Sequence, residues 1–239
     1  MNAAGVDLQG TTASIDADAW PKGLNRELRR LAEEEGVTEF VIENPRSRHN
    51  LAVGQTADVT IRFRGSVGNY CGGLNSGATI HVERNVGWAA GEAMARGKIV
   101  VEGNANMATG ASMRGGTIHI KGSAAARCGV SLKGGTLIVE GDVGYLSAFM
   151  THAGDLIVCG STGAAFADSL WQGNVWVAGE IRSLGTDAKV IEASDDEQAR
   201  VHGLLRENGV DGTFTFRKVV SEQKLWYFNN RNPDAWLKI

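Results

Sequence analysis

Proline and cysteine are both scarce in this sequence, and neither sign of charge is in large excess. The chain of 239 residues has three prolines, three cysteines and a net charge of −3 at pH 7. An odd number of cysteines without paired spacing argues against a disulfide framework and is typical of a reducing compartment, so we expect a cytoplasmic protein. Because both signs of charge are mixed along the chain, we expect no nucleic-acid partner.

Long hydrophobic runs are missing as well. No apolar stretch approaches the roughly 18 residues that span a bilayer. The N-terminal stretch MNAAGVDLQGTTASIDADAW has neither the basic nor the apolar region of a signal peptide. We therefore expect no membrane partner.

Glycine, by contrast, is abundant and periodic. It supplies 32 of the 239 residues, near twice its usual share of roughly 7%. Three series repeat at intervals of 19 residues, which indicates a repeat architecture. The first series is Gly65 and, past an exception at Arg84, Gly103, Gly122, Gly141, Gly160 and Gly179; the second is Gly97, Gly116, Gly135, Gly154 and Gly173; the third is Gly72, Gly91, Gly110 and Gly129, followed by Ala148 and Ala167.

A phosphate-binding loop is the main alternative explanation for so much glycine. No segment reads G-x-G-x-x-G between a strand and a helix. The nearest approach to a P-loop, GEAMARGKI from Gly91, has one residue too many between its glycines and lacks Ser or Thr after Lys98. We therefore interpret the glycines as structural, at corners where the chain needs positive φ or where one coil lies directly on the next.

Each repeat also contains a short segment of alternating polarity, which predicts a β-strand with one buried face. Its apolar positions form two rows: Ile80, Ile99, Ile118, Leu137, Leu156 and Val175, and, two residues on, Val82, Val101, Ile120, Val139, Val158 and Val177. A third row, Met94, Met113, Leu132 and Leu170, is interrupted by Asn75 and Thr151. A unit of this size cannot bury its own apolar face, but stacked units bury it in a continuous column.

We therefore predict an all-β core, a right-handed parallel β-helix of six to seven coils of 19 residues, which begins near residue 58 and ends near residue 185. Short α/β extensions are expected at both ends. The chain then divides into an N-terminal segment with a helix and a capping strand (1–50), the β-helix (51–185) and a C-terminal segment (186–239).

The two ends carry the only helical patterns. Residues 21–35 place leucines on one helical face before Gly36, and a strand follows from Val37, so this pair is expected to cap the first coil. Near the other end, Ser194 and Glu197 form a capping box for a helix that stops at Gly209. A strand from Thr213 follows, and then an aromatic tail with Trp226, Tyr227, Phe228 and Trp236.

The repeat converts sequence spacing into distance and so tests candidate sites. Cys71 and Cys128 lie three coils apart, roughly 14 Å, which excludes a disulfide, and Cys159 falls in another register. His81 and His119 lie two coils apart, roughly 10 Å, too far for one zinc ion, and their register points them outward. His49 and His152 are open to an ordinary polar role or to a contact in an interface or site.

An outward row of Glu83, Glu102, Lys121 and Glu140 is interpreted as a solvated or partner-facing stripe. A carboxylate acid–base pair would need a cleft, which so regular a stretch does not suggest. No Ser/His/Asp arrangement or G-x-S-x-G elbow is present. We predict no catalytic, cofactor-binding or metal-binding residue in this chain.

One outward row is apolar toward the C-terminal coils. It runs Arg62, His81, Val100, His119, Ile138, Ile157 and Trp176. An exposed apolar stripe usually marks a contact surface. We expect either the chain's own aromatic tail or a partner protein to cover it, and we favour the tail for the part near Trp176.

The repeats, with strands of the form G-x-[IVL]-x-[IV]-x-G, resemble the GXGXG motif β-helix family. That family includes the C-terminal domain of the large subunit of glutamate synthase and a subunit of formylmethanofuran dehydrogenase. The segments RSRHNLAVGQ from Arg46 and FRGSVGNYCGGLNSG look like the stretch that leads into the glutamate synthase β-helix. The resemblance covers residues 40 to 185; it is specific for the fold and weak for function.

As a separate chain with added ends, the sequence is similar to the small β-helix subunit of split, three-subunit relatives of glutamate synthase, N-methylglutamate synthase in particular. The resemblance implies a non-catalytic subunit of a hetero-oligomer. It would hold together a class II glutamine amidotransferase-like subunit and an FMN-dependent glutamate synthase-like subunit that carries the FMN and an iron–sulfur cluster. Catalytic residues would then lie in those partners, and the amine could be ammonia or methylamine.

Two other functions remain open at this stage. The first is the corresponding scaffold subunit of formylmethanofuran dehydrogenase, which serves a molybdenum or tungsten enzyme. The second is a free-standing carbohydrate-active β-helix enzyme. Such enzymes carry clustered outward Asp or Lys/Arg and longer coil insertions, and the even 19-residue period argues against both features.

Overall fold

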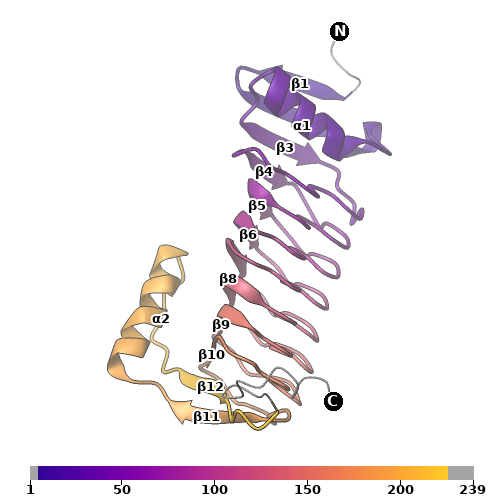
Figure 1. The fold of residues 1–239 in the computed structure, drawn as a ribbon. Helices are drawn as coiled ribbons and strands as arrows, with labels where there is room; N and C mark the ends of the chain where they lie inside the picture. Colours follow the sequence, from indigo (N-terminus) through magenta and orange to yellow (C-terminus); the bar gives the residue numbers. More distant parts are fainter. Residues whose placement is uncertain (1–4, 226–239) are drawn as a thin grey trace, which may run out of the picture.

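One continuous twelve-stranded sheet runs through the chain from end to end (Figure 1). The computed structural model describes residues 5–225. The strands follow chain order from β1 to β10, and the sheet then ends with β12 and β11. Its central part consists of β4 (Thr60–Phe63), β5 (Ser76–Val82), β6 (Arg96–Val101), β7 (Thr117–Ile120), β8 (Lys133–Val139), β9 (Ala153–Val158) and β10 (Asn174–Val177).

The strands β4 to β10 pair parallel, each with the next, at an offset of one repeat. Ile80 lies opposite Ile99, and Ile118 lies opposite Leu137. A second line of parallel bridges joins the coils on another side, through Val67, Val86, Ala105, Ala124, Val143, Thr162 and Ile181. The predicted parallel β-solenoid is therefore confirmed, and its seven strands β4 to β10 agree with the six to seven coils expected.

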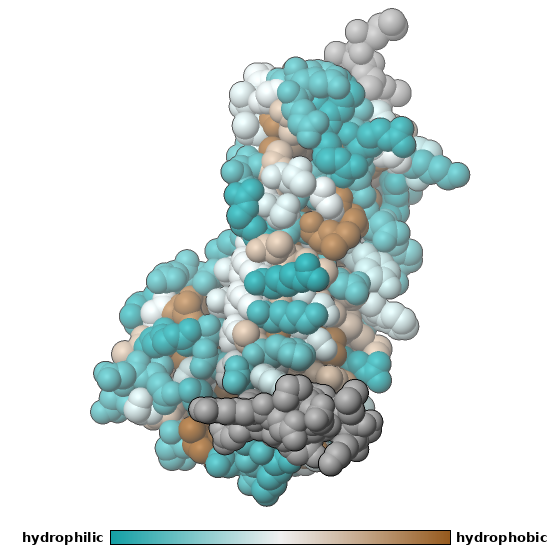
Figure 2. Space-filling view, in the orientation of Figure 1, coloured by the Kyte–Doolittle hydropathy of each residue, from teal (hydrophilic) through white to brown (hydrophobic). Residues whose placement is uncertain are grey.

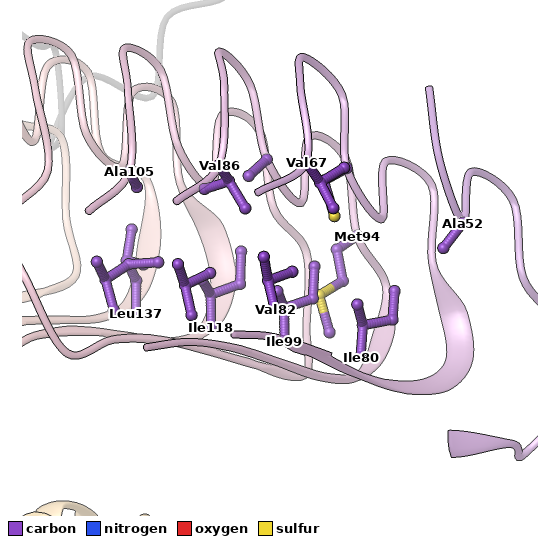
Figure 3. Close-up of a cluster of buried hydrophobic side chains, with 14 of the residues drawn as sticks. Ala52, Val67, Ile80, Val82, Val86, Met94, Ile99, Ala105, Ile118 and Leu137 are labelled. Atoms are coloured by element: carbon purple, nitrogen blue, oxygen red, sulfur yellow. The ribbon is translucent and has the colours of Figure 1, made fainter. Parts of the chain in front are cut away.

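The apolar rows fill the inside of the solenoid (Figure 3). Both strand rows, from Ile80 to Val175 and from Val82 to Val177, are fully buried, and so is the row of Met94, Met113, Leu132 and Leu170. Val67, Val86 and Ala105 lie across the interior from the strand rows (Figure 3). The polar exceptions in this third row are satisfied locally. The Asn75 side chain both donates to and accepts from the backbone of Ala78 (2.8 and 3.0 Å), and the Thr151 hydroxyl donates to the carbonyl of Ala148 (3.0 Å). A buried polar group with such a partner costs little.

The N-terminal segment extends the sheet rather than only closing it. The helix α1 (Leu24–Glu34) begins three residues later than predicted, and its Leu24, Leu28 and Leu31 join the main core. The strand β3 (Glu39–Glu43) pairs parallel with β4. Beyond it lie two strands that the sequence pattern did not predict, β1 (Val6–Gln9) and β2 (Thr12–Asp16), followed by a short 3-10 helix (Ala17–Ala19).

The C-terminal segment closes the other end with antiparallel strands. The strand β12 (Arg217–Ser221) pairs with β10 and with β11 (Ala188–Glu192). The strand β11 was not predicted from the sequence. Between them, the helix α2 (Asp195–Glu207) begins at Ser194 with both hydrogen bonds of the predicted capping box. It runs alongside the stack (Figure 1).

The outward apolar row is covered by this segment. Ile138, Ile157 and Trp176 pack in one buried cluster with Val201 and Leu205 of α2, and with Cys159, Val210 and Phe216. We predicted that the aromatic tail would cover the row near Trp176. Among the described residues, α2 and the segment after it cover the row. The tail residues Trp226, Tyr227, Phe228 and Trp236 lie outside the described residues.

The corners of the coils bring backbone against backbone. A Cβ atom added to Gly122 would lie 2.7 Å from the carbonyl oxygen of Gly103 in the preceding coil. At Gly135 the same approach, 2.6 Å from the oxygen of Gly116, is combined with a φ of +79°. Gly129 differs, because its φ is +69° but the nearest atom would be 3.4 Å away, on a leucine side chain. In the register of Gly129, Ala148 and Ala167 adopt φ of 60° and 57°.

A series of short polar side chains adds a further link between coils. The side-chain oxygen of each member accepts a hydrogen bond from the backbone N–H of the residue 19 positions later, at distances of 2.7 to 3.3 Å. The accepting residues are Ser66, Asn85, Asn104, Ser123, Asp142 and Ser161. This ladder is visible in the sequence at the same 19-residue interval and was not anticipated.

The glycine environments predict unequal costs for two matched substitutions in one coil. Gly129→Ala introduces only left-handed strain, so we expect it to lower the free energy of unfolding by about 1–2 kcal/mol. Gly135→Ala adds an overlap with backbone that cannot rotate away, and we expect a loss above about 3 kcal/mol or insoluble protein. Urea denaturation measures both. Equal effects would mean that the coils do not touch at the second glycine series.

Candidate functional site

The three cysteines lie inside the protein. Cys71, Cys128 and Cys159 are free and buried. Burial raises the pKa of each thiol to about 12, and the nearby Glu140 carboxylate adds to this effect on the pKa of Cys159. A thiol with so high a pKa is almost wholly protonated at neutral pH and is a poor nucleophile or metal ligand. These residues therefore act as small apolar packing groups.

The four histidines singled out from the sequence lie in different coils of the stack. His49 Nδ1 accepts a hydrogen bond from the backbone N–H of Asn69 (2.8 Å). His152 stacks on Trp171, with ring centroids 6.3 Å apart, and burial, followed by the charge of Lys133, lowers its pKa. His81 is half-buried on the outward face, and its pKa is lowered chiefly by burial.

His119 points out of its coil, as its register predicted, but it is not open to solvent. It is 1% exposed, and its Nε2 lies 2.8 Å from Oε1 of Glu140. Burial lowers the pKa of this imidazole, and the hydrogen bond to the carboxylate opposes that effect only in part. Because the imidazole is buried and held by this carboxylate, we interpret the pair as a structural contact within the stack.

The charged outward row is internally paired. Lys121 forms an ion pair with Glu102 (2.8 Å) and Glu83 with Arg64 of the preceding coil, while Glu140 is hydrogen-bonded to His119. These carboxylates remain roughly one-third to one-half exposed. The row is a partly solvated stripe, as interpreted from the sequence, rather than an acid–base pair in a cleft.

A buried carboxylate that sequence analysis missed fastens α2 to the sheet. Both carboxylate oxygens of Asp155 accept from Arg200 of α2 at 2.7 Å, and the Trp176 indole donates to the same carboxylate at 3.3 Å. The Asp155 side chain is 10% exposed, whereas that of Arg200 is 46% exposed. The repeat contained a signal, because Asp155 replaces a threonine that precedes it in the same register at Thr117 and Thr136.

Large apolar side chains are exposed at one edge of the coils. Tyr70, Leu74 and Trp88 lie in the first two coils, and Tyr145 lies further along the stack. Periodicity arguments missed them because they fall outside the strand rows. Such side chains contribute little to folding when exposed. The three that lie on adjacent coils, Tyr70, Leu74 and Trp88, are therefore candidates for contact with another molecule, whereas a single exposed ring such as that of Tyr145 is common on protein surfaces.

The described part of the chain does not assemble a recognisable metal centre. Among residues 5–225, no group of three or more His, Cys, Asp or Glu side chains is placed to hold a metal ion. No helix within that range is long and apolar enough to cross a bilayer.

Comparison with known proteins identifies the repeat region. Residues 41–207 match the family described as GXGXG motif. A segment of 64 residues is 38% identical to protein GlxC of Rhizobium meliloti (strain 1021). That alignment spans 26% of this chain and 28% of GlxC.

A solved structure shares the architecture. One chain in the crystal structure of the formyltransferase/hydrolase complex (FhcABCD) from Methylorubrum extorquens, in complex with methylofuran, superposes with a TM-score of 0.62 at 24% identity. The match covers 72% of this chain and 67% of that one. At this level of identity the likeness concerns the fold.

The geometry of Asp155 predicts an asymmetric response to substitution. Arg200→Met leaves a poorly solvated carboxylate without its cation, and we expect a loss of about 1–2 kcal/mol in stability, reduced from the full cost of a broken buried pair by the exposure of Arg200. Asp155→Asn retains an acceptor for the Trp176 indole and should cost less. Arg206→Met, on the exposed side of α2, should change stability by less than about 0.5 kcal/mol. Thermal denaturation measures these differences. A larger fall in melting temperature for Asp155→Asn than for Arg200→Met would contradict this account.

The burial of His119 predicts a pH effect on stability. Because its pKa in the folded protein lies below the ordinary value of 6.5, the unfolded chain binds a proton at a higher pH than the folded chain does. The stabilisation is therefore complete above pH 6.5 and is lost as the pH falls below that value. Urea denaturation between pH 7.5 and 5.5 should show a smaller loss of stability for His119→Gln than for the wild type. If the free energy of unfolding falls equally with pH in both proteins, the lowered pKa of His119 is contradicted.

Proposed function

The chain belongs to the GXGXG motif family, and from this membership we propose that it is the non-catalytic structural subunit of a glutamate synthase-like enzyme complex. The observation that carries the proposal is the extent of the family match, residues 41–207, which takes in strands β4 to β10 and α2. What this chain shares with the family is therefore the stack of coils itself, a framework rather than a single pocket.

The mechanical properties of the stack suit a scaffold. Each coil is hydrogen-bonded to its neighbours through the strands, the second line of bridges and the polar ladder. Such a column resists bending because any tilt between coils breaks backbone hydrogen bonds. Two proteins bound along it are held at a fixed separation, which is what transfer of a small nitrogen compound between two active sites requires.

We assign the chemistry to two partners. One is a class II glutamine amidotransferase-like subunit, which releases nitrogen from glutamine. The other is an FMN- and iron–sulfur-containing glutamate synthase-like subunit, which uses it. We propose N-methylglutamate synthase as the specific complex, with methylamine or ammonia as the amine, and the cytoplasm as its location.

A formyl-transfer complex is the second candidate. It is favoured by the likeness in fold to a chain of the formyltransferase/hydrolase complex. In that case the chain would have the same mechanical role, as the counterpart of the β-helix subunit of formylmethanofuran dehydrogenase. The two candidates differ in the partners bound, not in the part played by this chain.

Purification of the tagged chain from its native source discriminates between them. We expect an amidotransferase-like and an FMN-type synthase-like subunit to copurify, with flavin and iron–sulfur absorbance and glutamine-dependent formation of glutamate or N-methylglutamate. The chain expressed alone should show neither the absorbance nor the activity.

Copurification of formyltransferase and hydrolase subunits would replace the proposal with the second candidate. Turnover by the isolated chain, free of partner proteins, would contradict the scaffold role altogether.

A further inference from the structure

Three large apolar side chains are exposed together at the edge of the first two coils. The exposed fractions are 46% for Tyr70, 61% for Leu74 and 53% for Trp88. The Tyr70 N–H donates to the carbonyl of Trp88 at 2.7 Å, so these residues lie on directly adjacent coils. Figure 2 shows a compact hydrophobic patch on the visible face of the stack, below α1. Single exposed apolar residues are common, but a cluster usually marks a contact surface.

The corner geometry does not need large side chains at these positions. Tyr70 and Leu74 adopt φ of 60° and 56°. In the next three coils the corresponding pairs are Ala89 and Ala93, Ala108 and Ser112, and Arg127 and Ser131, with φ between 52° and 60°. Alanine and serine therefore satisfy the same turn. Since Tyr70 and Leu74 neither define the corner nor enter the core, their size is explained best by a contact with another molecule.

A pocket opens beside these residues. It has a volume of about 300 Å³ and is lined by Asn50, Val53, Tyr70, Gly73, Leu74, Glu92 and Ala93. This is room for one large apolar side chain. Tyr70 lines the pocket and Trp88 lies on the adjacent coil. Tyrosine and tryptophan are among the residue types that most often anchor protein–protein contacts.

One charge in this pocket lacks a partner. The Glu92 side chain is half-buried, and among the described residues its carboxylate forms no hydrogen bond or ion pair. Glu83 and Glu102, on the outward face of the strands, are both paired with cations of this chain. A half-buried carboxylate next to an apolar pocket is complementary to a segment that presents an apolar side chain and a cation together.

We infer that this pocket is the docking point for a catalytic partner subunit, which inserts a large apolar side chain between Tyr70 and Leu74 and pairs a lysine or arginine with Glu92. The inference rests on the proposed scaffold function and names the surface that performs it. It locates one partner at the N-terminal coils, far from the face that α2 covers over β8 to β10.

Variants of the tagged chain, purified from the native source, test the inference through the amount of partner retained. Leu74→Asp and Glu92→Arg should each reduce retention of one catalytic subunit at least tenfold, and Glu92→Gln should reduce it less. Retention by the wild type should fall with added salt more steeply than retention by Glu92→Gln. The matched control is Tyr145→Ala, which removes an aromatic ring of similar exposure (54%) at the same edge, four coils further along. It should retain both partners.

Stability and self-association of the isolated chain complete the test. All variants should melt at the wild-type temperature and sediment as the wild type does, because the substituted side chains are outside the core. If the wild type retains its catalytic partners and Leu74→Asp and Glu92→Arg retain them equally well, the inference is wrong and the proposed function stands. If the wild type retains neither kind of partner, the proposed function fails and the inference fails with it.

Two further results would overturn the inference by identifying another occupant. If the isolated wild type is a dimer and Leu74→Asp a monomer, the pocket holds a second copy of the chain. If Leu74→Asp and deletion of residues 226–239 lower the melting temperature of the isolated chain by the same amount, the pocket holds the chain's own tail.

Discussion

Contact of backbone with backbone between consecutive coils is the constraint on which the rest of the structure depends. At Gly122 there is no space for even a methyl group, because the carbonyl oxygen of Gly103 would lie 2.7 Å from it. With the corners this close, strands β4 to β10 align in register and their apolar rows merge into one column. The polar ladder from Ser66 to Ser161 then uses the same spacing to satisfy backbone N–H groups at the surface.

The sequence was sufficient for the parts of the fold that repeat. A strand residue such as Val139 has the same environment as Ile120 and Val158, so one pattern, read at 19-residue intervals, predicts burial for the whole row. The capping box at Ser194 was predictable for a related reason, because it is a local interaction between residues three apart. The extra strands β1, β2 and β11 are short and do not follow the repeat, so periodicity did not reveal them.

Contacts between distant segments were harder to predict. Nothing local specifies that α2 folds back over Ile138 and Ile157. From the sequence we weighed only the aromatic tail and a partner protein as their cover. The pairing of Asp155 with Arg200, 45 residues away, is likewise a contact between distant segments. The pocket beside Tyr70 depends on side chains from successive coils, which a search for catalytic motifs does not detect.

The surface of the stack has two kinds of region, one satisfied by contacts within the chain and one open to contact with another molecule. The sheet face over β8 to β10 is closed by the chain's own α2. In the charged outward row, Glu83 and Glu102 pair with Arg64 and Lys121, and Glu140 is hydrogen-bonded to His119. The edge near Tyr70 and Glu92 keeps both an apolar pocket and a carboxylate that has no partner among residues 5–225. This division suits the proposed scaffold role, because a subunit that positions others must be rigid and must bind them at defined surfaces. Hydrogen exchange of the isolated chain, followed by mass spectrometry, tests the rigidity most directly. The account predicts that peptides from β4 to β10 are protected to a similar degree and lose protection together in one cooperative step as urea is added. Independent opening of coils at one end, with the others still protected, would contradict a single rigid column.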